Sequence, residues 1–172
     1  MKNILRVSSI IILVLSAGLF VAWANEDESD KVVVGEKAPD FKVVTPDGEL
    51  NVADLRGKVV LVNFFATWCG PCLKELPVLQ KEVWEKYKSN DDFVLLVIGR
   101  EHSAKELEKF AKEKEFDLPF CPDENRQIFS KFAAQSIPRN YIIDKGGKII
   151  YASKGYSHSE FEHMISVLKK CL

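Results

Sequence analysis

The feature that most limits the possible folds is an apolar run followed by two closely spaced cysteines. Val59–Phe65 is apolar except for Asn63, as expected for a central strand that is covered on both faces of a sheet. Cys69 and Cys72 follow in the string Trp-Cys-Gly-Pro-Cys. From there, apolar residues recur at helical spacing as far as residue 88. The sequence therefore predicts that the two cysteines lie where a buried strand leads into a helix.

Strands and helices alternate along most of the chain. A turn at 45–48 should join two short strands, 41–44 and 49–52, into an N-terminal hairpin. After the first helix we expect, in order, a strand at 93–99, a helix at 103–116, a short strand at 118–120, a helix at 123–134, strands at 140–144 and 148–152, and a helix at 159–170. This order predicts an α/β fold, with a central mixed β-sheet flanked by helices on both faces and an N-terminal β-hairpin extension.

Short polar motifs mark the starts of the later helices. Ser103 and Glu106 have the spacing of a capping box, and Ser157 with Glu160 repeats it before the last helix. Asp123 is expected to cap the helix between them. These motifs predict where three helices begin.

The N-terminus differs in composition from the rest of the chain. Lys2 and Arg6 precede an apolar run at 7–23, which ends in the small-x-small triplet at 22–24. This arrangement predicts a secretory signal peptide over residues 1–24. The alternative is an uncleaved membrane anchor, since a run of about 17 residues is at the short limit for a spanning helix.

The remaining chain is predicted to be one domain outside the cytosol. Residues 25–31 are polar and acidic, so residues 25–33 are expected to be a linker, and residues 34–172 form the expected domain. The leader directs that domain to the periplasm or to the outer face of the cytoplasmic membrane, where disulfides can persist. Contact with the membrane is expected only through an uncleaved N-terminal segment.

Charge argues against one large class of functions. The net charge of the chain is −1 and no long basic run is present. Proteins that bind nucleic acids need clustered positive charge to neutralise phosphates. We therefore expect no nucleic-acid partner.

Three roles of the cysteine pair other than redox chemistry have little support. A zinc site would need two further ligands at suitable spacing, but the other cysteines and the histidines occur singly. Haem attachment would need a histidine directly after Cys72, where Leu73 stands. A structural disulfide across four residues would constrain the unfolded chain very little. No metal site is predicted.

The predicted position of Cys69 favours thiol–disulfide exchange. At a helix N-terminus its thiolate would be stabilised by unpaired backbone N–H groups and by the helix dipole. Gly70 and Pro71 suit the first helical turn, because the missing N–H of proline costs nothing there. Cys69 is thus the predicted nucleophile, and Cys72, one turn further on, the cysteine that resolves the mixed disulfide. No cofactor is expected beyond this redox-active disulfide.

Several separated motifs resemble exported thioredoxin-fold proteins of the TlpA/ResA type, within the wider AhpC/TSA-Redoxin-like superfamily. These motifs are residues 35–41, 55–58, 60–77 with the Cys-Gly-Pro-Cys core, 137–138 and 141–144. The resemblance covers residues 34–172 and implies a thioredoxin fold and a thiol–disulfide oxidoreductase.

The resemblance also implies roles for residues outside the cysteine pair. Pro138 matches the cis-proline of the family, and the backbone of Ile137 would pair with a bound substrate strand beside Trp68. Asn63 stands where thioredoxin has a buried aspartate, and TlpA/ResA-type proteins often have Asn there. Glu75 is expected either to relay a proton to Cys72 or to be an ordinary surface acid.

The resemblance favours a reductase that acts on disulfides of exported proteins, such as apocytochrome c before haem attachment. Its electrons would come from a membrane protein of the DsbD or CcdA kind. One alternative is a peroxidase of the peroxiredoxin type, although Ala66 and Val62 replace the Thr or Ser and the Pro of that family. The other is a non-enzymatic binding module with the same fold.

The two other cysteines carry no motif. Cys121 follows the strand expected at 118–120, and Cys171 lies at the end of the last helix. An inert, buried thiol is the favoured interpretation for Cys121, and a bridge or a third redox role is left open. His102 is expected in a loop on the same side of the sheet as the cysteine pair.

Overall fold

The central element of the computed structural model, which describes residues 29–172, is strand β3, Val59–Phe65. Every residue of β3 is buried, as its apolar composition predicts. The predicted leader at 1–24 lies outside the described residues, as does the start of the predicted linker. Within residues 29–172, no helix is both long and apolar enough to span a bilayer.

Five strands form one mixed sheet in the order β5-β4-β3-β6-β7. Strand β3 pairs in parallel with β4 and antiparallel with β6, and the β6–β7 hairpin completes one edge. A separate antiparallel hairpin is formed by β1 and β2. The strands other than β3 are β1 (Lys42–Thr45), β2 (Gly48–Asn51), β4 (Phe93–Arg100), β5 (Phe120–Asp123), β6 (Arg139–Ile143) and β7 (Ile149–Lys154).

The helix after the cysteine pair is built from three consecutive segments. Helix α1 (Gly70–Leu79) continues through a π-helical turn (Gln80–Trp84) into α2 (Glu85–Tyr87), close to the predicted length. The π turn was not predicted from the sequence. The other helices are α3 (Ala104–Lys114), α4 (Phe129–Phe132), α5 (His158–Cys171) and a short 3-10 helix, Val52–Leu55.

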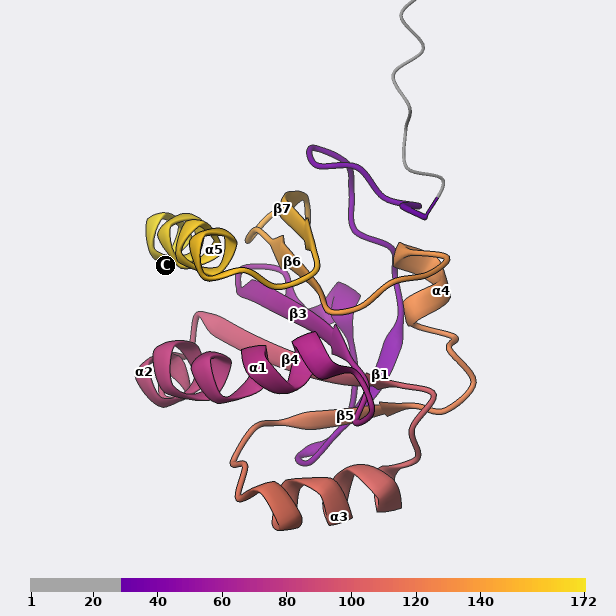
Figure 1. The fold of residues 1–172 in the computed structure, drawn as a ribbon. Coiled ribbons are helices and arrows are strands. Elements are labelled where there is room, and N and C mark those ends of the chain that lie inside the picture. Colours follow the sequence, from indigo (N-terminus) through magenta and orange to yellow (C-terminus); the bar gives the residue numbers. More distant parts are fainter. Residues whose placement is uncertain (1–28) are drawn as a thin grey trace, which may run out of the picture.

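Helices cover both faces of the sheet, as predicted, but unequally (Figure 1). Helices α1, α3 and α5 share one buried apolar cluster with alternate residues of β3. The opposite face of β3 packs against α4, the β1–β2 hairpin and Val32. Parallel crossovers of one hand from β3 to β4 and from β4 to β5 place α1 and α3 on the same face.

Two predicted elements need correction. The strand expected at 118–120 is β5, Phe120–Asp123, so Cys121 lies within it and pairs with Ile98 rather than following it. The helix expected at 123–134 is only the single turn α4. Asp123 is the last residue of β5 and not the N-cap residue, which is Ile128, but its carboxylate accepts hydrogen bonds from the backbone N–H groups of Ile128 and Phe129.

Other local predictions are confirmed. Ser103 and Glu106 form a reciprocal capping box at the start of α3. Ser157 accepts a hydrogen bond from the backbone N–H of Glu160 at the start of α5. The turn at 45–48 joins β1 to β2. Each of these depends on residues close in sequence, which explains why the sequence alone predicts them.

Candidate active site

The cysteine pair lies at the junction of β3 and α1, as predicted. Cys69 is the N-cap residue of α1, and its Sγ accepts a hydrogen bond from the backbone N–H of Cys72 at 3.3 Å. Gly70 and Pro71 occupy the first helical positions. The sulfur of Cys69 is therefore placed against unpaired N–H groups at the positive end of the helix dipole, which stabilises a thiolate there.

The two sulfurs are joined and differ in accessibility. Cys69 and Cys72 form a disulfide with a Cα–Cα distance of 5.3 Å. Cys69 retains 6% of its surface, whereas Cys72 retains none. An incoming thiol or disulfide can therefore reach Cys69 first, which agrees with the roles expected from the sequence.

The segment that contains Ile137 and Pro138 packs beside the disulfide. The Ile137–Pro138 peptide bond is cis, as the resemblance predicted. The carbonyl oxygen of Ile137 lies 3.7 Å from the Sγ of Cys69. The backbone of Ile137 thus lies at the edge of the disulfide, where an extended substrate could pair with it.

Trp68 forms the exposed border of the site. Its exposed fraction is 63%, although it stands directly before a buried cysteine. The guanidinium of Arg100 lies 5.5 Å from the centroid of the Trp68 ring and 5.2 Å from that of Phe129. This cation–π contact orients the indole beside the disulfide. Sequence patterns predict only that the loop at 100–102 lies on this side of the sheet, and they do not reveal the Arg100 contact.

Beneath the disulfide lies a buried polar group that we call the carboxyl network, made of Asn63, Glu75 and Asn140. The amide nitrogen of Asn63 donates to Glu75 Oε2 at 3.2 Å and to Asn140 Oδ1 at 2.8 Å. The amide nitrogen of Asn140 donates to Glu75 Oε1 at 2.6 Å. Asn63 and Asn140 face each other across β3 and β6, which explains how both reach one carboxyl.

Glu75 is not a surface acid, so that alternative is wrong. Only 1% of its surface is exposed. Burial raises the pKa of Glu75 to about 7, and the hydrogen bonds from Asn140 and Asn63 oppose the rise without cancelling it. A carboxyl with this pKa, three residues after Cys72, can exchange a proton near neutral pH. Asn140 was missed from the sequence because no motif singled it out.

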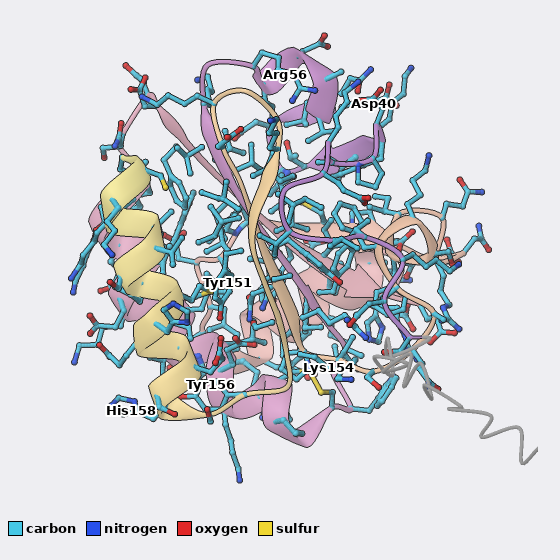
Figure 2. All side chains as sticks on the ribbon, turned by 90° about the horizontal axis from the view of Figure 1, so that it is seen from above. Asp40, Arg56, Tyr151, Lys154, Tyr156 and His158 are labelled. Atoms are coloured by element: carbon cyan, nitrogen blue, oxygen red, sulfur yellow. A yellow bond between two sulfur atoms is a disulfide. The ribbon has the colours of Figure 1, made fainter. Side chains whose placement is uncertain are left out.

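The space beside Glu75 extends towards the start of α5. The side chain of Tyr151 extends from β7 towards α5 (Figure 2). Its hydroxyl donates to Glu160 Oε1 at 2.6 Å, and burial raises the pKa of Tyr151. Glu75, Asn140, Tyr151 and Glu160 line one narrow space.

His102 supports the segment just before the cysteines. Its Nε2 accepts a hydrogen bond from the backbone N–H of Thr67 at 3.0 Å, and 6% of its surface is exposed. Burial lowers the pKa of His102, which favours the neutral ring that this contact requires. The sequence placed His102 on the correct side of the sheet but did not reveal this contact.

The remaining cysteines lie away from the disulfide chemistry. Cys121 is fully buried and unbridged, so the prediction of a buried thiol is confirmed, and burial raises the pKa of that thiol to about 12. Cys171 is partly buried and also free. Within residues 29–172, no group of His, Cys, Asp and Glu has the arrangement of a metal site.

Comparison with known proteins gives concordant results. The Redoxin family model matches residues 33–171. The thiol–disulfide oxidoreductase ResA of Bacillus cereus is 30% identical over 164 residues, which cover 92% of each chain.

Solved structures share the fold. A Bacteroides thetaiotaomicron protein, named for a proposed protein disulfide isomerase activity, superposes with a TM-score of 0.79 and 37% identity, over 84% of this chain and 92% of that one. An exposed lipoprotein thioredoxin of Streptococcus pneumoniae gives a TM-score of 0.60 and 26% identity, over 75% and 99% of the two chains.

Proposed function

This chain belongs to the Redoxin family, and from that premise we propose that it is a thiol–disulfide oxidoreductase of the ResA type that reduces disulfides of exported proteins. The observation that carries the proposal is the geometry of Cys69. Its sulfur is the more accessible of the two, accepts an N–H at the start of α1 and faces the carbonyl of Ile137. Such a sulfur is suited to nucleophilic exchange.

In the proposed reaction, the reduced enzyme gives two electrons to a partner disulfide. The Cys69 thiolate attacks one partner sulfur, so that a mixed disulfide forms and the other partner sulfur leaves as a thiolate. The Cys72 thiolate then attacks Cys69, which restores the Cys69–Cys72 disulfide and releases the second partner sulfur. Ile137 and Trp68 border the sulfur on which both steps occur.

Glu75 is the proposed proton carrier for the second step. Cys72 is fully buried and must lose its proton before it can attack. A carboxylate held one helical turn away, with a pKa of about 7, can accept that proton at neutral pH. Asn63 cannot titrate, so it can only orient Glu75 and cannot replace it.

We place this activity outside the cytosol. The leader predicted at 1–24 supports export, and the similar pneumococcal protein is described as an exposed lipoprotein. The proposed substrates are exported proteins with exposed disulfides, including apocytochrome c, and the proposed electron source is a membrane reductase of the DsbD or CcdA kind.

A trapping experiment tests the proposed chemistry. The Cys72→Ser variant keeps the nucleophile but cannot resolve the mixed disulfide, so adducts through Cys69 should accumulate and mass spectrometry would identify the partner. Cys69→Ser is the matched control and should trap nothing. Equal trapping by the two variants, or none by either, would contradict the proposed order of attack.

The reduction potential tests the direction of electron flow. A reductase should have a potential well below the strongly oxidising value of about −120 mV that is typical of DsbA. Equilibration of the purified protein with glutathione buffers measures it. A value near that of DsbA would overturn the reductase assignment and leave the exchange chemistry intact.

A further inference from the structure

The first described residues contact the segment that leads to the active-site proline. Ser29 accepts a hydrogen bond through its carbonyl from the backbone N–H of Ala134 at 2.8 Å, and the backbone N–H of Lys31 donates to the carbonyl of Phe132 at 3.0 Å. Asp30 forms an antiparallel bridge with Ala133 between these bonds. In Figure 1 the chain accordingly enters the domain beside α4.

Arg139 connects this entry point to the active-site loop, residues 135–138. It follows Pro138 directly and is 2% exposed. Its Nε donates to the carbonyls of Gln135 and Ser136 at 3.1 and 3.0 Å. Its terminal nitrogens donate to the carboxylate of Asp30, to Ser29 Oγ at 2.7 Å and to the hydroxyl of Tyr141.

The active-site loop depends on these contacts for its shape. Ser136 has a φ of +67°, in the left-handed region that non-glycine residues rarely adopt. Gln135 and Ser136 are exposed, so water competes for their carbonyls when Arg139 is displaced. Arg139 therefore stabilises the conformation that places the next carbonyl, that of Ile137, beside Cys69.

A buried guanidinium needs a carboxylate to remain where it is. The Arg139 side chain is 2% exposed and that of Asp30 is 44% exposed, so removal of the carboxylate leaves the guanidinium as an uncompensated charge at the buried end of the pair. Asp30 is the one acid in an ion pair with Arg139 among the described residues. It belongs to residues 29–31, which we call the entry segment, and is separated from Arg139 by more than a hundred residues of chain.

We propose that Ser29 and Asp30 are positioning residues of the substrate site, and that they act through Arg139 on the loop that carries Ile137. The inference rests on the proposed exchange function and adds a structural role for the segment that directly follows the leader. Residues 29–30 and the substrate-binding edge are then parts of one connected unit.

The expected effect falls on substrate binding. In Asp30→Asn the loop samples more conformations, and a substrate strand must order it before pairing with Ile137. The KM for a peptide disulfide should rise about fivefold to tenfold with kcat little changed, which is the signature of lost uniform binding. The reduction potential should not move, because Cys69 and the start of α1 are untouched.

The experiment uses the full chain and two disulfide substrates. One is an extended peptide disulfide, which needs the Ile137 edge, and the other is the small aromatic disulfide DTNB, which does not. Asp30→Asn and Ser29→Ala are compared with Asp47→Asn, the same charge change in the exposed turn between β1 and β2. Asp30→Glu, which retains the carboxylate, should restore a low KM.

Each outcome has a distinct meaning. A rise in KM for the peptide alone, larger in Asp30→Asn than in Ser29→Ala and absent in Asp47→Asn, supports the inference. Equal KM values in Asp30→Asn and Asp47→Asn, or equal losses with peptide and DTNB, overturn it. If Asp30→Asn does not fold, Ser29→Ala decides, with an expected rise of about twofold. Failure of the unmodified protein to reduce either substrate would instead reject the proposed function.

Discussion

The two faces of strand β3 are built from alternate residues of one seven-residue segment, yet they contain different chemistry. Towards α4, the side chain of Phe64 enters an aromatic cluster with Phe41, Phe129, Phe132 and Tyr141, with centroid separations of 4.9–6.1 Å between neighbouring rings. Towards α1, the neighbouring Asn63 enters the carboxyl network beneath the disulfide.

The difference between these faces is the buried acid, not the amount of apolar surface. Both faces bury apolar side chains, which stabilise the fold roughly in proportion to their area. The site face also contains a buried carboxyl whose ionisation is opposed by its surroundings. We infer that the aromatic cluster around Phe64 contributes to stability separately from the chemistry at Cys69, whereas the carboxyl destabilises the folded state at high pH.

The largest effect on stability is expected on the aromatic face. Phe64→Ala removes a fully buried ring that contacts Phe129, Phe132 and Tyr141. The free energy of unfolding should fall by about 3–5 kcal/mol, as measured by denaturant titration. The alkylation rate of Cys69 in the reduced, folded variant should stay within about twofold of the parent, because the ring points away from α1.

Phe64→Leu sharpens the same test. It keeps most of the apolar volume, so the loss of stability should be clearly smaller than for alanine. A large change in the Cys69 alkylation rate in either folded variant would show that the two faces are coupled, and would contradict the separation proposed above.

An intermediate effect is expected from Glu75→Gln, and it should depend on pH. Between 4.5 and about 7 the folded chain binds more protons at Glu75 than the unfolded chain does, so the free energy of unfolding falls as pH rises through this window. The variant lacks this loss. Relative to the parent protein, its stability should be about 3 kcal/mol more favourable at pH 8 than at pH 4.

Denaturant titrations at the two pH values measure this difference. Glutamine has nearly the shape of the protonated acid, and its side-chain oxygen can still accept the hydrogen bond from the amide nitrogen of Asn140. The rate of disulfide exchange should fall in the variant, since the proposed proton acceptor is lost. A stability difference that is the same at both pH values would show that Glu75 does not titrate in this range.

The smallest effect on stability is expected at the border of the site. Trp68→Ala removes an exposed ring, so the free energy of unfolding should change by less than about 1 kcal/mol, chiefly through loss of the Arg100 contact. The KM for a peptide disulfide should rise, because the substrate loses an aromatic surface beside Cys69. Unchanged kinetics would remove Trp68 from the substrate site.

Elements defined by neighbouring residues were largely predictable on both faces of the sheet. The apolar run of β3, broken only by Asn63, and the capping residues Ser103 of α3 and Ser157 of α5 identify such elements. The junction of strand, cysteine pair and helix is equally local. The resemblance to TlpA/ResA-type proteins added the cis bond at Pro138, which spacing alone does not specify.

The features that were missed depend on contacts between distant segments. The burial of Glu75 depends on Asn140, which is 65 residues away in sequence. The burial of Arg139 depends on Asp30, 109 residues away. The length of helix α4 was overestimated, because Asp123 is a suitable capping residue and the sequence showed no early end to the helix. In the structure, the chain after Phe132 turns away to pair with the entry segment. Local patterns do not encode these pairings.

The burial of Cys121 has a consequence for repeated turnover. Burial raises the pKa of its thiol to about 12, so this side chain stays protonated at neutral pH. Its side chain also belongs to the apolar cluster on the face of the sheet opposite to Cys69 and Cys72, so it has no direct access to the working pair. Because this thiol stays protonated, it takes no part in the exchange. Successive oxidation and reduction cycles therefore involve the Cys69–Cys72 bond alone.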